Sequence, residues 1–369
     1  MLNRRQFLPA VALGSRQFAR AAAPRFRVES VEIISQQPEF YHGWPTVARR
    51  KSGELLVVYS GGREGHVCPF GRVEIICSKD DGRSWSWPQV LMNSVIDDRD
   101  AGVIETAAGS LLVTTFTSLA YQSIASKVGT WRWEAVERRT TQEQRKSMLG
   151  TWMLRSTDGG MTWSAPYRVP LNSPHGPIAL SDGRLLYAGR QLWDPGSKVG
   201  VCESHDDGQT WRWLSDIPAR PGDRVEKYHE LHIAQAAGDR LVVHIRDENK
   251  PRQTETLQCE SEDGGKTWTV PHSIDVPGYP SHLLRLHDGR LLMTYGYRRN
   301  PYGNQARISD DQGHGWSAPM PISGDGASGD LGYPSTVELA NGSLVTVWYE
   351  LLSASPRAVL RMARWSIEA

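Results

Sequence analysis

Four arginines recur at one place in a repeated phrase of this chain. The phrase is a turn that contains Gly, followed by a strongly apolar run, and four of its copies end on Arg63, Arg190, Arg246 and Arg298. A planar guanidinium group binds a carboxylate through two parallel hydrogen bonds. If these arginines meet at one point of the fold, they would form a site for an acidic ligand such as an acidic sugar.

Side chains that could transfer protons stand beside the same apolar runs. They are His42, His66, His175, His229 and Tyr279. A histidine or tyrosine next to clustered arginines can serve as general acid or base on a uronic acid. These residues are scattered and lack the tight histidine and carboxylate spacing of a metal site, so we expect neither a metal nor another cofactor.

The elements that must position these residues are indicated by an octet that occurs five times, Ser-x-Asp-x-Gly-x-x-Trp. Its copies are Ser78–Trp85, Ser156–Trp163, Ser204–Trp211, Ser261–Trp268 and Ser309–Trp316. An alternating apolar run precedes each copy and a short run follows it, which predicts strand, tight turn, strand. The Asp is expected to accept hydrogen bonds from its own turn, and the Gly to supply a positive φ. Repeats at this spacing indicate a propeller, a solenoid or an array.

The octet resembles the Asp box of sialidase-type β-propellers, and the chain is similar to that superfamily from about Phe40 to its end. The resemblance implies an all-β, six-bladed β-propeller with Asp-box turns between the outer strands of the blades. The apolar phrase occurs six times, in Ser52–Arg63, Ala108–Thr117, Asp182–Arg190, Gly238–Arg246, Asp288–Arg298 and Asn341–Glu350. We expect the N-terminal run Phe26–Ile34 to pair with the last unit and close the ring, which leaves no free sheet edge.

The same resemblance implies a set of site residues. Gly332-Tyr333-Pro334-Ser335 is similar to the strand that carries the nucleophilic tyrosine of sialidases, and Trp348-Tyr349-Glu350 is similar to the strand after it. The implied roles are nucleophile for Tyr333, its base for Glu230, carboxylate binding for Arg246 and Arg298, and support of a clustered arginine for Glu350. The neighbouring candidates for contact with the substrate are His42, Trp44, Arg190 and His229.

Two departures from the sialidase pattern alter this expectation. Sialidases open with an Arg-Ile-Pro strand, but the aligned residues here are Gly43-Trp44-Pro45, so the first arginine is absent. Arg63 is our candidate for the missing charge. The following loop, which carries the acid/base Asp in that family, contains no Asp. The candidates for the acid are His66, Glu64, Asp97 and Asp100, and the sequence does not choose between them.

The ends and the bulk composition predict where the protein acts. Arg4-Arg5 before Phe7-Leu8 is typical of a twin-arginine export signal. We expect residues 1–23 to direct export to the periplasm or the cell exterior, and residues 24–369 to form one propeller with a partly helical insert near 121–148. The formal net charge of +1 offers no field for nucleic acid. No segment is long and apolar enough for a membrane span, and we expect a monomer whose partner is a glycan.

Three functions remain open at this point. The first is an exo-glycosidase acting on a terminal sialic acid or a similar acidic sugar, which predicts contact between Tyr333 and Glu230 and at least three arginines within reach of one carboxylate. The second is a glycosidase or lyase that acts on another, uronic-acid-containing glycan through His or Tyr. The third is a non-catalytic binding propeller, which predicts an open or poorly charged axis, since a repeat fold alone implies no activity.

Overall fold

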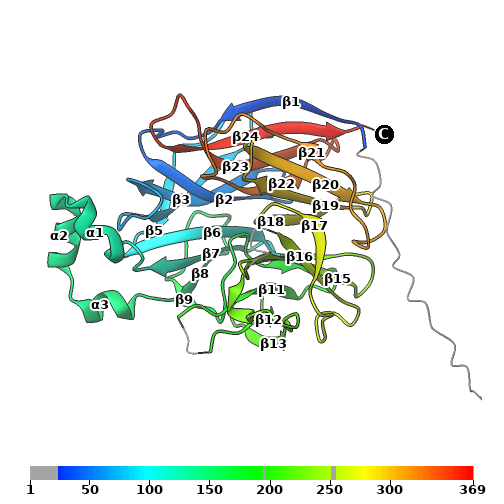
Figure 1. Cartoon of the computed structure of the whole chain (residues 1–369), viewed down its shortest axis with the longest axis horizontal. Coiled ribbons are helices and arrows are strands. Elements are labelled where there is room, and N and C mark those ends of the chain that lie inside the picture. Colours follow the sequence, from blue (N-terminus) through cyan, green and yellow to red (C-terminus); the bar gives the residue numbers. More distant parts are fainter. Residues whose placement is uncertain (1–23, 194–195, 251–254, 369) are drawn as a thin grey trace, which may run out of the picture.

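The computed structural model describes residues 24–193, 196–250 and 255–368, and in these residues the chain forms six four-stranded antiparallel sheets (Figure 1). The predicted export signal, residues 1–23, lies outside the described residues. The sheets are the six blades of a β-propeller, so the predicted fold class is confirmed. None of the helices in the described part of the chain has the length and apolar character needed to cross a membrane.

Each blade runs from an innermost to an outermost strand. Blades 1 to 3 are β2 (Tyr41–Arg49), β3 (Leu55–Arg63), β4 (Arg72–Ser78) and β5 (Gln89–Met92); β6 (Asp97–Glu105), β7 (Leu111–Ser118), β8 (Thr151–Ser156) and β9 (Tyr167–Arg168); and β10 (Ile178–Ala179), β11 (Leu185–Arg190), β12 (Val199–Ser204) and β13 (Arg212–Asp216). Blades 4 and 5 are β14 (Tyr228–Gln235), β15 (Leu241–Asp247), β16 (Thr256–Ser261) and β17 (His272–Val276); and β18 (Ser281–Arg285), β19 (Leu291–Tyr297), β20 (Gly303–Ser309) and β21 (Met320–Pro321).

Blade 6 combines the two ends of the chain. Its inner strands are β22 (Leu331–Glu338), β23 (Leu344–Leu351) and β24 (Ala358–Ile367), and its outer strand is β1 (Phe26–Ile33). β1 pairs antiparallel with β24 from Phe26 opposite Ile367 to Ile33 opposite Arg361, and the two strands run side by side in Figure 1. The predicted closure of the ring is therefore confirmed, and the N-terminal strand covers what would otherwise be an exposed edge.

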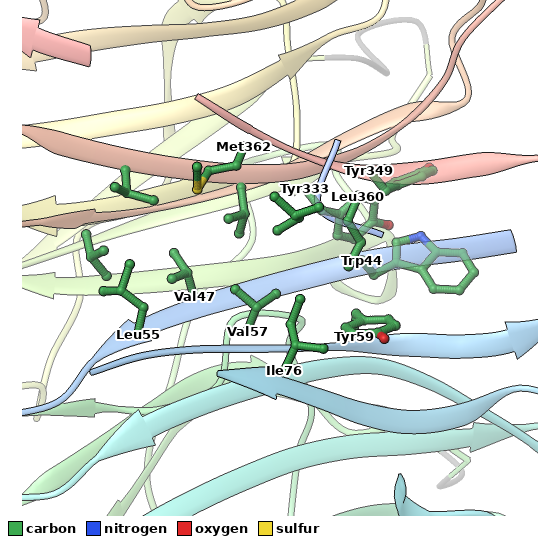
Figure 2. Close-up of a cluster of buried hydrophobic side chains, with 14 of the residues drawn as sticks. Trp44, Val47, Leu55, Val57, Tyr59, Ile76, Tyr333, Tyr349, Leu360 and Met362 are labelled. Carbon is green, nitrogen blue, oxygen red and sulfur yellow. The ribbon is translucent and has the colours of Figure 1, made fainter. Parts of the chain in front are cut away.

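The continuous apolar runs occur because both faces of the second strand of a blade are buried. Neighbouring side chains of a strand point to opposite faces. In β3, Leu55, Val57 and Tyr59 pack against blade 6, whereas Leu56 and Val58 pack against blade 2. Figure 2 shows the core between blades 1 and 6, with Trp44 and Tyr349 at one end and Leu55 and Met362 toward the other. Every blade is thus buried on both faces, which requires runs without polar alternation.

The Asp boxes join the third and fourth strands of five blades, as predicted. In the first box, Ser78 Oγ donates to Asp80 Oδ1 at 2.7 Å and accepts from Gly82 N at 2.8 Å. Asp80 Oδ1 also accepts from Ser84 N at 2.9 Å, and Gly82 has a φ of 84°. The Ser, Asp and Gly of the other four boxes repeat this pattern. The Ser, Asp and Gly that recur in the octet therefore stabilise the turn itself.

The insert after β7 contains three short helices, α1 (Gln122–Val128), α2 (Trp131–Arg139) and α3 (Gln142–Ser147). They project from one side of the propeller (Figure 1). Tyr121 and Trp133 are buried with Cys68 and Ile96, and Trp133 Nε1 donates to Glu64 Oε2 at 2.8 Å. The insert is therefore fastened to the loop that connects β3 and β4.

Candidate functional site

One irregularity recurs in four of the innermost strands. The register of β2, β6, β14 and β22 shifts against the second strand of the blade at a β-bulge. One non-glycine residue in each bulge has a positive φ: Trp44 (54°), Asp100 (45°), Glu230 (48°) and Tyr333 (53°). Such a backbone costs on the order of 1–3 kcal/mol per residue, and a bulge changes the direction of a side chain. Four blades thus use the same device to redirect one side chain each.

Two of these redirected side chains meet directly. The Tyr333 hydroxyl donates a hydrogen bond to Glu230 Oε1, across 103 positions of sequence. Arg246 Nη1 lies 2.9 Å and 2.7 Å from the two Glu230 oxygens and 3.4 Å from the Tyr333 hydroxyl. The contact that the sequence predicts between Tyr333 and Glu230 is present.

The charges around this pair favour a neutral phenol beside an ionised carboxylate. Burial and the nearby charge of Glu230 raise the pKa of Tyr333 well above its ordinary value. Burial alone would raise the pKa of Glu230, but the Arg246 guanidinium and the hydrogen bond from Tyr333 lower it below the ordinary value. Glu230 is therefore ready to accept the proton that Tyr333 must lose to act as a nucleophile.

Arg298 places a cation beside Tyr333. Its guanidinium carbon lies 5.8 Å from the ring centroid of Tyr333 and 5.2 Å from that of Tyr279, and Nε donates to the Leu331 carbonyl at 3.0 Å. Among the described residues, no carboxylate forms an ion pair with Arg298, whereas Arg246 is paired with both Glu230 and Glu248. The two terminal nitrogens of Arg298 suit an incoming carboxylate.

Trp44 stands at the position where a sialidase would have its first arginine. It is buried, and the guanidinium carbon of Arg99 lies 4.2 Å from its ring centroid, with that of Arg63 at 4.8 Å. Arg99 directly precedes Asp100 in the bulge of β6, so sequence position would have pointed to it, but it was not among the predicted site residues. It brings a further cation to the group.

Asp100 belongs to the same neighbourhood. Its side chain is buried, and Oδ1 has no hydrogen-bond partner among the described residues. Burial raises the pKa of Asp100 to about 7; Arg99 opposes this shift and Glu230 adds to it. Asp100 is therefore a carboxylic acid that can remain protonated near neutral pH.

His66 and Tyr333 both pack edge-on against Trp44. The ring centroids of Trp44 and His66 are 5.1 Å apart, and those of Trp44 and Tyr333 are 6.4 Å apart. His66 Nδ1 is 2.9 Å from Asp330 Oδ1. Asp330 was not predicted as a site residue, and no sequence signal marks it, because it precedes β22 without a motif of its own.

Two acidic candidates for the acid/base role are held in ion pairs. Both oxygens of Asp97 bind the Arg63 guanidinium, with Nη2 to Oδ2 at 3.0 Å, and both side chains are fully buried. Glu64 pairs with Arg132 and accepts from Trp133 of the insert. Arg63 is thus buried in an ion pair with Asp97, and Glu64 fastens the insert.

Arg190 and His229 form an adjoining group. Arg190 Nη1 lies 3.1 Å from His229 Nε2, and His229 lies 3.6 Å from Glu248, which binds Arg246 at 2.7 Å. Burial lowers the pKa of Arg190 and that of His229. This group extends the polar surface from Glu230 toward blade 3.

Two further predicted residues lie in contacts outside the group around Tyr333. Glu350 accepts from Arg361 Nη1 at 2.6 Å and Trp348 Nε1 at 3.0 Å, so the arginine that it holds is Arg361 of β24 and not a member of the cluster. His42 bonds Ser35 Oγ at 2.7 Å and packs edge-on against Tyr59, and burial lowers its pKa to about 4. The contacts of Glu350 and His42 thus hold neighbouring strands and loops together.

No group of three His, Cys, Asp or Glu side chains in residues 24–193, 196–250 and 255–368 is arranged to hold a metal ion. The chemistry that the described side chains can perform is proton transfer by Glu230, Asp100 or His66, nucleophilic attack by Tyr333, and binding of an anion by arginine.

Comparison with known proteins identifies the family of this chain. Residues 114–346 match the family described as BNR repeat-like domain. The chain belongs to this family. Among the curated relatives of this BNR-repeat protein, a Paenibacillus xyloglucanase is 29% identical over 49% of the chain, and a Clostridium perfringens sialidase is 23% identical over 67% of it. The chain spans only 19% and 52% of the lengths of these two relatives.

The fold of the BNR-repeat protein matches solved structures across nearly its full length. A protein of unknown function from Dyadobacter fermentans superposes with a TM-score of 0.77 and 22% identity, covering 93% of this chain and 99% of that one. Together with the sialidase relative, this confirms the resemblance to BNR-repeat propellers of the sialidase superfamily.

Proposed function

We propose that this BNR-repeat protein is an exported exo-glycosidase that removes a terminal sialic acid, or a similar acidic sugar, from glycans. The observation that carries the proposal is the hydrogen bond from the Tyr333 hydroxyl to a Glu230 carboxylate that Arg246 holds. The names of the relatives support the class, since they include a sialidase and a xyloglucanase, both enzymes of glycans.

The pair supports a double displacement. A phenol with an ordinary pKa of about 10 is a weak nucleophile at neutral pH unless a base takes its proton. Glu230 accepts that proton as the Tyr333 oxygen attacks the anomeric carbon, which gives a covalent tyrosyl sugar that water then hydrolyses. A neutral nucleophile avoids the repulsion that a carboxylate would meet at an anionic sugar. Two inversions at one carbon give overall retention.

Recognition of the acidic group is assigned to the arginines next to the pair. Arg298 forms no ion pair with a described carboxylate and packs against the rings of Tyr333 and Tyr279. The guanidinium carbon of Arg246 lies 4.3 Å from the ring centroid of Tyr279. Arg99 supplies further positive charge beside Trp44. A bidentate contact between guanidinium and carboxylate fixes both the position and the orientation of the sugar.

A second candidate is a glycosidase or lyase for another, uronic-acid-containing glycan. The observation that favours it is the first blade, where Trp44 takes the place of the arginine expected of a sialidase and where Arg63 is engaged with Asp97. His66 and His229 would then act as the general acid and base. Export remains part of both proposals, and cleavage of residues 1–23 from secreted protein, read by N-terminal sequencing, tests it.

The test measures release of 4-methylumbelliferone from the α-glycoside of N-acetylneuraminic acid and from the β-glucuronide. We expect turnover of the sialoside by the wild type and a loss of kcat on the order of 10³-fold or more in Tyr333→Phe, as for the removal of other nucleophiles. Tyr167→Phe is the matched control, because Tyr167 lies on the outer strand β9 and its hydroxyl donates to the Gly208 carbonyl in the Asp-box turn of blade 3.

The outcomes separate the three functions. Turnover of the glucuronide alone would transfer the assignment to a uronic acid. No turnover of either substrate by a folded wild type, together with binding of sialylated or uronic-acid glycans, would identify a binding propeller. Full activity in Tyr333→Phe would contradict the tyrosyl mechanism.

A further inference from the structure

His66 is an exposed titratable side chain that packs edge-on against Trp44. About 47% of its side chain is exposed, and Nδ1 lies 2.9 Å from Asp330 Oδ1. Asp330 is held in turn by the Tyr41 hydroxyl, at 2.9 Å and 3.1 Å from its two oxygens, and by the Tyr349 hydroxyl at 3.2 Å. Ser328 Oγ accepts from the Asp330 backbone N–H at 3.1 Å.

The hydrogen bonds assign the tautomer of His66. Tyr41 has one hydroxyl proton, and it points to Asp330, so the 2.9 Å approach of that hydroxyl to His66 Nδ1 cannot supply a donor to the ring. Nδ1 must therefore carry a proton, which it donates to the carboxylate. Nε2 is left for an outside partner, and no described side chain hydrogen-bonds to it. A ring nitrogen fixed by a carboxylate on its far side is the arrangement of an oriented acid/base group.

The aromatic contacts place this pair beside the nucleophile. The ring of Trp44 touches His66 and Tyr333 edge-on at 5.1 Å and 6.4 Å between centroids. Tyr349 also contacts both groups: its hydroxyl donates to Asp330, and its ring centroid lies 5.9 Å from that of Tyr333. The His66–Asp330 pair and Tyr333 thus share two neighbours, Trp44 and Tyr349.

We propose that His66 is the general acid and base of the reaction and that Asp330 positions it. The inference rests on the proposed function. It adds the acid that the mechanism needs, and two other candidates for that acid, Glu64 and Asp97, are bound in ion pairs with arginine. The catalytic group is His66, and Asp330 acts through it.

The proton and electron balance of the two steps is complete. In the first step the Tyr333 oxygen forms a bond to the anomeric carbon and its proton passes to Glu230. The bond from that carbon to the leaving oxygen breaks, and this oxygen takes the proton of protonated His66 Nε2. In the second step water attacks the carbon, its proton passes to Nε2, and the Tyr333 oxygen leaves and recovers the proton from Glu230.

Four titratable or charged groups surround the His66–Asp330 pair. They are Asp330 itself, Tyr41 of β2 and Tyr349 of β23, and Arg63, whose Nη2 donates to the His66 carbonyl at 2.8 Å. Burial would raise the pKa of Asp330, but the hydrogen bond and charge of His66 lower it, so Asp330 is ionised at neutral pH. The pKa of Tyr41 is raised by burial, by Tyr349 and by Asp330, and Tyr41 stays neutral.

The experiment compares a good and a poor leaving group. The 4-methylumbelliferyl α-sialoside releases an acidic phenol that needs little protonation, whereas 3′-sialyllactose releases a sugar hydroxyl that needs it. We expect His66→Gln to lower kcat/KM by about 10²–10⁴-fold on sialyllactose, the range of a general acid, and far less on the aryl sialoside. His272→Gln is the matched control, since His272 is half exposed and binds Glu260 through Nε2 at 2.9 Å on β17.

Asp330→Asn tests the positioning role through a readout that a structural role would not move. An amide cannot hold the protonated imidazole as the carboxylate does, so kcat/KM should fall by about 10-fold or more on sialyllactose and far less on the aryl sialoside, whereas a merely structural loss would lower both equally. Equal losses on both substrates, in His66→Gln or in Asp330→Asn, would overturn the proposal. If Asp100→Asn gave the leaving-group selectivity in place of His66→Gln, Asp100 would be the acid.

The experiments distinguish a wrong role for His66 and Asp330 from a wrong proposed function. If the folded wild type hydrolyses neither sialoside nor the aryl glucuronide, the proposed function is wrong and the role of His66 falls with it. If the wild type hydrolyses the sialosides and His66→Gln matches His272→Gln, only the role of His66 is wrong. If the glucuronide alone is hydrolysed, the effect of His66→Gln on an aryl and an alkyl glucuronide tests whether His66 is the acid.

Discussion

Glu230 and Tyr333 occupy the same position in two different blades. Each stands in a bulge of the innermost strand, with φ values of 48° and 53°, and the Tyr333 hydroxyl donates to the Glu230 carboxylate. The strained backbone at both ends of one hydrogen bond indicates that the fold maintains this pair against a local cost.

Glu230 is expected to set an acid limit on activity that lies below the ordinary glutamate range. Its pKa is raised by burial but lowered, on balance, by Arg246 and Tyr333, so the carboxylate stays ionised until the pH falls through that lowered value. A pH profile of kcat/KM should therefore keep its activity to a pH below the usual glutamate pKa of about 4.3. Glu230→Gln should lower kcat/KM by about 10²–10⁴-fold, and Glu338→Gln, on the same strand as Tyr333 but bound to His287, should not.

Arg298→Lys should weaken substrate binding without weakening the fold. Arg298 forms no ion pair among the described residues, so its replacement leaves no buried carboxylate alone. Lysine keeps the charge and loses the planar fork. We expect KM for the aryl sialoside to rise about 10-fold or more, which is about 1.4 kcal/mol, with an unfolding free energy within about 0.5 kcal/mol of the wild type. A large loss of stability would show that Arg298 is structural.

Asp97→Asn should destabilise the protein strongly, because it leaves Arg63 charged and buried. The side chains of Arg63 and Asp97 are both 0% exposed. Removing one partner of a buried ion pair costs about 3–5 kcal/mol, whereas Glu134→Gln removes an exposed pair with Arg138 worth about 0.3–0.5 kcal/mol. Urea unfolding of the two variants measures the difference, and similar midpoints would refute the structural role of the Arg63–Asp97 pair.

Asp100→Asn should remove part of the pH dependence of stability. The folded-state pKa of Asp100, raised by burial to about 7, lies above the unfolded value of about 3.9. The folded protein therefore holds more protons between these values, and stability falls as pH rises from about 4 through 7. The free energy of unfolding should drop less between pH 5 and pH 8 in the variant than in the wild type. An equal drop would mean that Asp100 is ionised in the folded protein.

Much of the fold could be predicted because its signals are local. The Asp-box hydrogen bonds join residues two to four positions apart, such as Ser78 with Asp80 and Gly82, so an octet specifies them completely. The apolar run Leu55–Tyr59 likewise records that both faces of β3 are buried. Within the site, the resemblance led to Tyr333 and Glu230, and these two do meet in the structure.

Other site residues could not be predicted, because their partners lie far away in sequence. Arg63 ends the same apolar phrase as Arg246, yet Arg63 binds Asp97 of the next blade and Arg246 binds Glu230. Glu350 follows the sialidase pattern but holds Arg361. The repeated phrase is identical in form, so only the side chains that surround each copy decide whether its arginine is exposed to a ligand.

The sequence by itself determined the repeat, the number of blades and the closure of the ring, because turns and strand alternation depend on neighbours along the chain. The tertiary structure alone decided which charged groups face one another. His66 and Asp330 are 264 positions apart, and their contact exists only because blade 6 closes against blade 1. The bulges that turn Trp44, Asp100, Glu230 and Tyr333 complete the arrangement, since the direction of a side chain depends on backbone geometry that residue type does not specify.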